Sequence, residues 1–134
     1  MWALFDHDGR TDIDAACAQA LRSQVTPILS HPAFELWLLL HFQDFSPAAQ
    51  DGSNQVIIEK LRSASKEFAS YGQSGKRLGI RQFAALSAND GIAAAVERAR
   101  RLAVACEGHA PDKRDPSTDI FLVVEALGIV PAVT

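Results

Sequence analysis

The chain has 134 residues, of which 48% are hydrophobic and 22% are charged, and its formal net charge at pH 7 is −3. This length fits one domain with one core, and the composition excludes a disordered, collagen-like or low-complexity chain. The longest apolar run, residues 36–40, is too short to cross a bilayer, so we expect a soluble, cytoplasmic protein with no membrane partner. Two cysteines, Cys17 and Cys106, are too few for a disulfide framework or a four-ligand zinc site.

The first predicted elements are two short strands joined by a helix. Residues 2–6 form an apolar run that ends in an aspartate, and residues 25–29 form a second apolar run that contains Pro27. Between them, apolar residues repeat at helical spacing from Ile13 to Leu21. A connection of this length allows the strands to be parallel, with a right-handed crossover. Pro27 predicts that the second strand is an edge strand or is bulged.

The rest of the chain is predicted to be mostly helical. Residues 33–42 are apolar nearly all round, which predicts a central buried helix. A glycine-punctuated basic loop is expected at residues 71–79, and a charged loop at 107–116. Further helices are predicted over residues 54–69, 81–86, 90–106 and 115–127. The expected fold class is therefore α/β: a small parallel sheet, with strands near residues 2–6 and 25–29, and a mostly helical C-terminal part.

Charge is unevenly distributed along the chain. Residues 1–59 hold two basic and eight acidic side chains, whereas residues 60–81 hold six basic and one acidic. A basic stretch beside an acidic one is typical of a phosphate-binding surface next to a metal site. The candidate nucleic-acid-binding residues are Lys60, Arg62, Lys66, Lys76, Arg77 and Arg81. The alternative is a solvated helix face around Lys60, Arg62 and Lys66.

Three carboxylates are the candidate catalytic groups. Asp6 and Asp8 follow the first strand, at the end where open α/β sheets bind their ligands, and together they can reach one Mg²⁺ or Mn²⁺. Glu35 begins the buried helix after the second strand, so parallel pairing brings it toward the same sheet edge. We therefore predict Asp6, Asp8 and Glu35 as catalytic residues and the two aspartates as metal ligands. The alternatives are an acidic turn and carboxylates that stabilise helix N-termini.

The four histidines are predicted to have structural rather than catalytic roles. His41 lies about 240° around the helix from Glu35, so we interpret it as an interior histidine with its hydrogen bonds satisfied. His31 is assigned to a capping loop, and His7 and His109 are expected to be exposed to solvent. The chain has no GxxxxGK[ST] and no HExxH motif, which excludes P-loop triphosphatases and zincin proteases.

Two stretches of sequence resemble known families. The first, LFDHDGRT at residues 4–11, resembles the opening motif of haloacid dehalogenase-type phosphatases. That resemblance implies an aspartate nucleophile at Asp6 and an acid/base at Asp8.

The second resemblance covers most of the chain. The DxD pair, the string SHPAFELWLLLHF at residues 30–42 and the DPST at residues 115–118 resemble the RloB-like family of bacterial proteins. The resemblance implies a Toprim-like, Mg²⁺-dependent nuclease of a phage-defence or restriction-modification locus, which acts on nucleic acid, with an ABC-type ATPase as a partner and a homodimer as one assembly. In the Toprim pattern a glutamate on an earlier strand is the acid/base, and no residue of this chain matches it.

The acid/base glutamate of the Toprim pattern has no counterpart in this chain, which suggests that part of the domain is missing. The chain is expected to be a single RloB-like domain, residues 1–134, that lacks an N-terminal strand and helix. The absence of that glutamate also supports a second hypothesis, in which the chain is a non-catalytic subunit that binds the ATPase partner.

Overall fold

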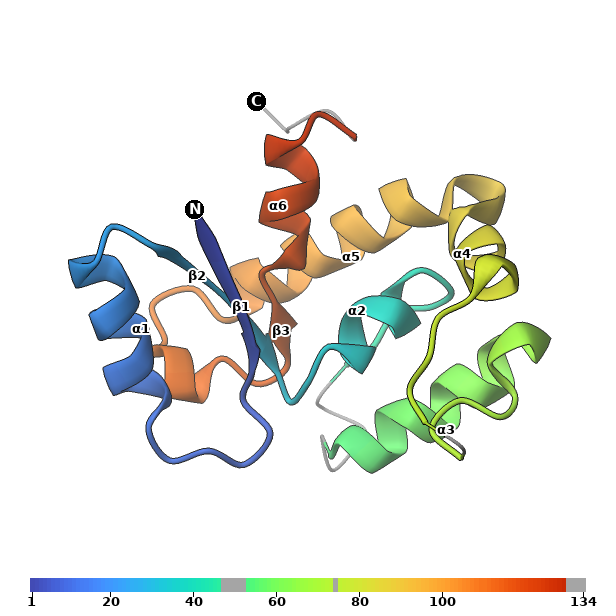
Figure 1. Cartoon of the computed structure of the whole chain (residues 1–134), viewed down its shortest axis with the longest axis horizontal. Coiled ribbons are helices and arrows are strands. Elements are labelled where there is room, and N and C mark those ends of the chain that lie inside the picture. Colours follow the sequence, from blue (N-terminus) through green and yellow to red (C-terminus); the bar gives the residue numbers. More distant parts are fainter. Residues whose placement is uncertain (47–52, 74, 130–134) are drawn as a thin grey trace.

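A computed structural model describes residues 1–46, 53–73 and 75–129 of the chain (Figure 1). None of the helices in these ranges is long and apolar enough to span a membrane. Short 3₁₀ turns lie at Lys66–Phe68, Ala88–Asp90 and Pro111–Lys113. The other elements are, in chain order, β1 (Trp2–Asp6), α1 (Ile13–Arg22), β2 (Thr26–His31), α2 (Glu35–Leu40), α3 (Asn54–Ala64), α4 (Ile80–Ser87), α5 (Gly91–Ala105), β3 (Ser117–Thr118) and α6 (Ile120–Ala126).

The first two strands are parallel neighbours joined by α1, as the sequence predicts. Their register pairs Trp2 with Thr26 and Asp6 with Ser30. Within the described residues the strand order is β1–β2–β3, so β1 is an outer strand with one hydrogen-bonded neighbour. Because both strands run in the same direction, residues that follow them lie at the same edge of the sheet.

The third strand corrects two predictions. Ser117 and Thr118 form β3, antiparallel to the end of β2, where the sequence predicts the start of a helix. The sheet is therefore mixed, and β2 is its central strand rather than an edge strand. Pro27 fits there because β3 pairs with Ser30 and His31, so that no strand in the described part of the chain lies beside the proline nitrogen. Asp119 extends this pairing, since Leu29 donates its N–H to the Asp119 carboxylate (3.2 Å) and its carbonyl accepts the Asp119 N–H (2.9 Å).

Two apolar clusters lie on different sides of the sheet. A small one holds α1 against the strands through Ile13, Cys17 and Leu29, with Phe5 beside them. The large one is built around α2, whose six residues are all buried, and α2 packs on α3 and α5. The apolar string at residues 36–40 is thus the centre of the helical part of the molecule, as the sequence predicts. Both cysteines are buried and free.

Some predicted helices differ in length from the observed ones. Helix α3 ends at Ala64, five residues before the predicted end, because Ser65 is extended (φ −146°, ψ 131°). The chain then makes the 3₁₀ turn that buries Phe68. Helix α6 covers only Ile120–Ala126, so it begins five residues after the predicted start at residue 115. The predicted loop at 43–52 falls partly outside the described residues.

Candidate functional site

Asp6 and Asp8 lie in the turn that leaves β1. Asp6 is the last residue of β1, and its carboxylate accepts a hydrogen bond from the Phe34 backbone N–H. Asp8 has a positive φ of 42°, and its N–H donates to the Pro32 carbonyl at 2.8 Å. The turn is therefore attached to the segment that leads from β2 into α2. This attachment brings both aspartates to the start of α2.

Glu35 is the charged residue of the otherwise apolar α2. Its side chain is only 3% exposed, and Oε1 lies 2.5 Å from the Lys76 Nζ. Asn54, at the start of α3, donates its Nδ2–H to the same oxygen at 3.5 Å. A buried carboxylate is costly unless it is paired, and here the partner comes from the basic loop at residues 71–79. Glu35 thus joins α2, α3 and this loop at one point.

The charges of the neighbouring residues act on Asp6 and Lys76. Burial raises the pKa of Asp6, and the charges of Glu35 and Asp8 raise it further, while the Phe34 N–H and Lys76 oppose the rise. The hydrogen bond to Glu35 raises the pKa of Lys76, so its ammonium stays charged at neutral pH. Burial, with Glu35 and Asp6 nearby, raises the pKa of Tyr71 to about 12. We call Asp6, Asp8, Glu35 and Lys76 the carboxylate–lysine cluster.

The donor chemistry of this cluster fits a hard divalent cation. Within the described ranges, no three His, Cys, Asp or Glu side chains are close enough together to form a metal site by themselves. Mg²⁺ needs fewer, because it is held by one or two carboxylates and keeps several waters. The Asn54 Oδ1 is buried beside Glu35 with no hydrogen-bond partner among the described residues, and an amide oxygen is a ligand that hard cations accept. Asp6 and Asp8 are the residues that would hold the cation.

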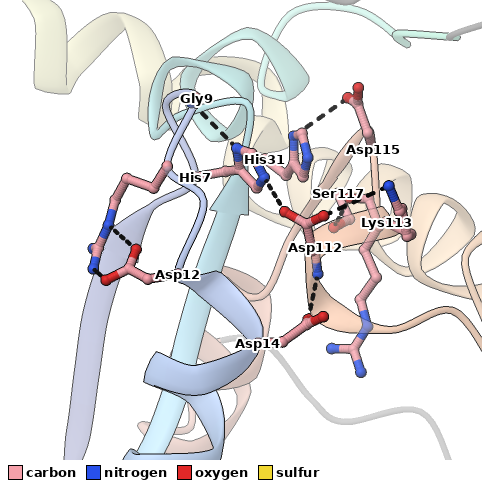
Figure 2. Close-up of polar contacts among 11 residues, drawn as sticks. His7, Gly9, Asp12, Asp14, His31, Asp112, Lys113, Asp115 and Ser117 are labelled. Atoms are coloured by element: carbon pink, nitrogen blue, oxygen red, sulfur yellow. Dashed lines mark hydrogen bonds and ion pairs between the residues drawn. The ribbon is translucent and has the colours of Figure 1, made fainter.

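Histidines form a second polar cluster, which sequence reasoning missed (Figure 2). The side chain of His7 is only 13% exposed, contrary to the prediction, and its ring stacks on His31 with centroids 3.7 Å apart. His7 Nε2 lies 2.7 Å from Asp112 Oδ1, while its Nδ1 accepts the Gly9 N–H at 3.2 Å. Both ring nitrogens are therefore engaged, with the proton on Nε2. This bonding fixes the turn between Asp6 and Asp8 against the loop after α5.

His31 is the buried member of this pair. It ends β2 rather than lying in a capping loop, and its Nδ1 is buried with no hydrogen-bond partner in the described part of the chain, 3.5 Å from Asp115 Oδ1. Burial lowers the pKa of His31, against the opposing charge of Asp115. Asp112 is held in turn by Asp14, whose Oδ1 accepts the Asp112 N–H at 2.9 Å. His109 is exposed, and His41 is an interior residue whose Nδ1 bonds the Trp37 carbonyl at 2.9 Å, both as predicted.

The predicted nucleic-acid-binding residues are divided among several places. Lys76 belongs to the carboxylate–lysine cluster, and Arg62 donates to the Tyr71 carbonyl at 2.7 Å, which anchors the start of the basic loop. Lys66 and Arg81 line one hollow of about 550 Å³, between Phe42 and α4. Arg77 lines a smaller neighbouring hollow, and Lys60 a separate one on α3. No single hollow or contact among those described includes all six side chains, and their binding of nucleic acid stays a prediction.

An apolar hollow of about 230 Å³ opens beside Asp6. Leu4 and Ile28 lie opposite each other in the sheet and alternate with Phe5 and Leu29, which face α1. The hollow is therefore on the sheet face away from α1. Phe5, Ser30, Phe34 and Ile120 complete its lining.

The fold and the site define a class: an α/β protein that gathers carboxylates and a lysine at the carboxyl edge of two parallel strands. A family model described as RloB-like protein matches residues 1–127, and the chain belongs to this family. The match confirms the resemblance carried by residues 30–42 and 115–118. No curated protein and no solved structure matches the chain significantly.

Proposed function

We propose that the chain is a Mg²⁺-dependent, Toprim-like nuclease or phosphodiester-processing component of a bacterial phage-defence or restriction-modification locus. The observation that carries the proposal is the carboxylate–lysine cluster, in which residues of β1, α2 and the basic loop converge on one sheet edge. Mn²⁺ is the alternative cation. The family membership supports the proposal without specifying the substrate.

The residues of the carboxylate–lysine cluster, and His7 beside it, have different roles in the proposed function. Asp6 and Asp8 supply the negative charge that holds a cation, and the bound cation would stabilise charge that develops on the scissile phosphate. Glu35 is held rigidly because α2 is buried on all sides. Lys76 supplies a positive charge on a side chain that is 55% exposed, so it can reach an incoming phosphate. His7 positions the turn that carries both aspartates.

Asp8→Asn is expected to abolish Mg²⁺-dependent cleavage of nucleic acid while leaving the fold intact, because Asp8 is exposed and its backbone contact is retained. The measurement is cleavage of single- and double-stranded DNA and RNA by the purified chain, with Mg²⁺ or with a chelator. Asp12→Asn is the matched control, since Asp12 is exposed and pairs only with Arg10 among the ion pairs described. Cleavage that survives Asp8→Asn unchanged would contradict the metal role of Asp8.

A non-catalytic role beside an ABC-type ATPase is the second candidate, and an exposed apolar face of α4 favours it. Ile80 is 88% exposed and Phe83 is 55% exposed, and their spacing puts them on one side of the helix. An apolar helix face of this kind is suited to a protein partner. The phosphatase with Asp6 as nucleophile stays a prediction that no observation here favours.

Phe83→Ser is expected to lower the amount of ATPase that co-purifies with the chain by about tenfold, the typical cost of losing an aromatic interface residue. The measurement is co-purification after co-expression with the ATPase of the same locus. Val104→Ser is the control, because Val104 is 70% exposed on a different helix, α5. Equal recovery with both variants would remove α4 as the docking face.

A further inference from the structure

Lys76 occupies the electrostatic centre of the candidate site. Its ammonium contacts Glu35 at 2.5 Å, and the charges of Asp6 and Asp8 also act on it. Lys76 is thus the one cation of the cluster: it contacts Glu35 directly and is attracted to Asp6 and Asp8 through space. The cluster retains excess negative charge, which favours binding of a further cation of higher charge.

The lysine and the carboxylates differ in how firmly they are held. Glu35 belongs to the fully buried α2, and Asp6 closes a strand. Lys76 comes from the loop that starts at Tyr71, and that loop is attached through the Arg62–Tyr71 hydrogen bond five residues earlier. More than half of the Lys76 side chain is exposed, so it can leave Glu35 with little loss of packing. Glu35 and Asp6 are thus held in place by the fold, whereas the Lys76 ammonium can exchange partners.

We propose that the Lys76 ammonium offsets the charge of the carboxylates in the metal-free protein and is displaced from Glu35 when a divalent cation binds at Asp6 and Asp8. This inference rests on the proposed function, because it concerns the same site. A divalent cation beside Asp6 and Asp8 would repel the ammonium and attract the Glu35 carboxylate, so the ion pair and the divalent cation compete. Displacement leaves the Lys76 charge free for the phosphate of the substrate. Cation binding thereby prepares the site for a polyanion.

The test is the affinity of the full chain for Mg²⁺, measured by isothermal titration calorimetry without nucleic acid. Lys76→Gln removes the competing charge and keeps a hydrogen-bond donor for Glu35. We expect this variant to bind Mg²⁺ about five- to tenfold more tightly than the wild type, in the usual range of coupling between two sites. Arg77→Gln is the matched control, since it removes a neighbouring positive charge that makes no ion pair with Glu35 among the contacts described. It should change the affinity by less than about twofold.

A second measurement covers the case in which the unpaired Glu35 destabilises the variant. The melting temperature of each protein is followed against Mg²⁺ concentration, and the Mg²⁺-induced rise should be larger for Lys76→Gln than for wild type or Arg77→Gln. Equal or weaker Mg²⁺ binding by Lys76→Gln would overturn the inference, even if the wild type cleaves nucleic acid. Tighter binding by Lys76→Gln with no cleavage by the wild type would uphold the inference and count against the nuclease. Binding by neither protein would overturn both.

Discussion

Asp6→Asn is expected to lower Mg²⁺-dependent cleavage about a hundredfold or more, the usual cost of removing one group that stabilises transition-state charge. The same substitution should slightly stabilise the fold at neutral pH. Asn retains an oxygen for the Phe34 N–H, and it ends the repulsion that Asp6 experiences from Glu35 and Asp8. Loss of activity with a gain of stability is the pattern of a residue kept for function rather than for folding.

The sign of the pH dependence follows from the raised pKa of Asp6. A folded-state pKa above the unfolded value of 3.8 means that the folded protein binds this proton more tightly. The contribution of Asp6 to stability is therefore complete below about pH 3.8 and is lost as the pH rises through its folded pKa. At pH 7 the charged Asp6 opposes folding, and Asp6→Asn should gain about 0.5 kcal/mol, a small value because the group is partly solvated.

Urea unfolding of wild type and variant at pH 7 and pH 4 provides the measurement. The gain should be present at pH 7 and should shrink at pH 4. Asp12→Asn gives the opposite sign, since the Arg10 hydrogen bond lowers the pKa of Asp12 and its charged form favours folding. A loss of stability with Asp6→Asn at pH 7 would contradict the electrostatic account, whatever the cleavage assay gives.

Gly91→Ala is expected to lower the free energy of unfolding by about 2 kcal/mol, in the range of overpacked positions. A Cβ at this position would lie 2.1 Å from the Leu86 backbone carbonyl oxygen, closer than any real contact. The φ of Gly91 is −56°, so the cost is steric rather than conformational. Alanine has the better helix propensity by up to about 1 kcal/mol, which offsets only part of the clash. Relief requires α4 and α5 to move apart, because the obstacle is backbone.

Gly79→Ala is the matched control for this experiment. There the added Cβ would meet the Gln82 Oε1 at 3.2 Å, and the end of a flexible side chain can move away. Its effect should stay below about 1 kcal/mol. Both values come from urea unfolding at one pH. An effect of Gly91→Ala as small as that of Gly79→Ala would show that the turn between α4 and α5 adjusts freely.

Much of the fold was predictable because local signals and tertiary packing agree. The run at residues 2–6 forms β1 with those bounds, and helical periodicity located α1 and α5 within one or two residues. The antiparallel β3 was not predictable, since two residues carry no periodicity and their pairing depends on contact with β2. The prediction of an edge strand from Pro27 was wrong for a related reason. Proline lacks an N–H on only one side of the strand, and the sequence does not show whether a neighbouring strand pairs on that side at that position.

The site was predictable where it follows from topology. Parallel strands and the position of Glu35 at the start of α2 were enough to expect the three carboxylates at one sheet edge. The partner of Glu35 was not predictable, because Lys76 arrives from a loop 41 positions later in the chain. The burial of His7 was missed for the same reason, since Asp112 lies 105 residues away. The alternation of His7 with Asp6 and Asp8 was the only local signal that it shares their turn.

The outer position of β1 has a consequence for how this site can be completed. Trp2–Asp6 contains no proline and no lysine, the residues that usually prevent an outer strand from accepting a further one. An extended segment that adds to this edge in the direction of β1 would end beside Asp6, just as β2 ends beside it on the other side. The first side chain after such a segment would lie near Asp6 and would interact electrostatically with the three carboxylates. Strand complementation, within one polypeptide or between two, is thus a route by which an additional acidic or basic group can reach the candidate site.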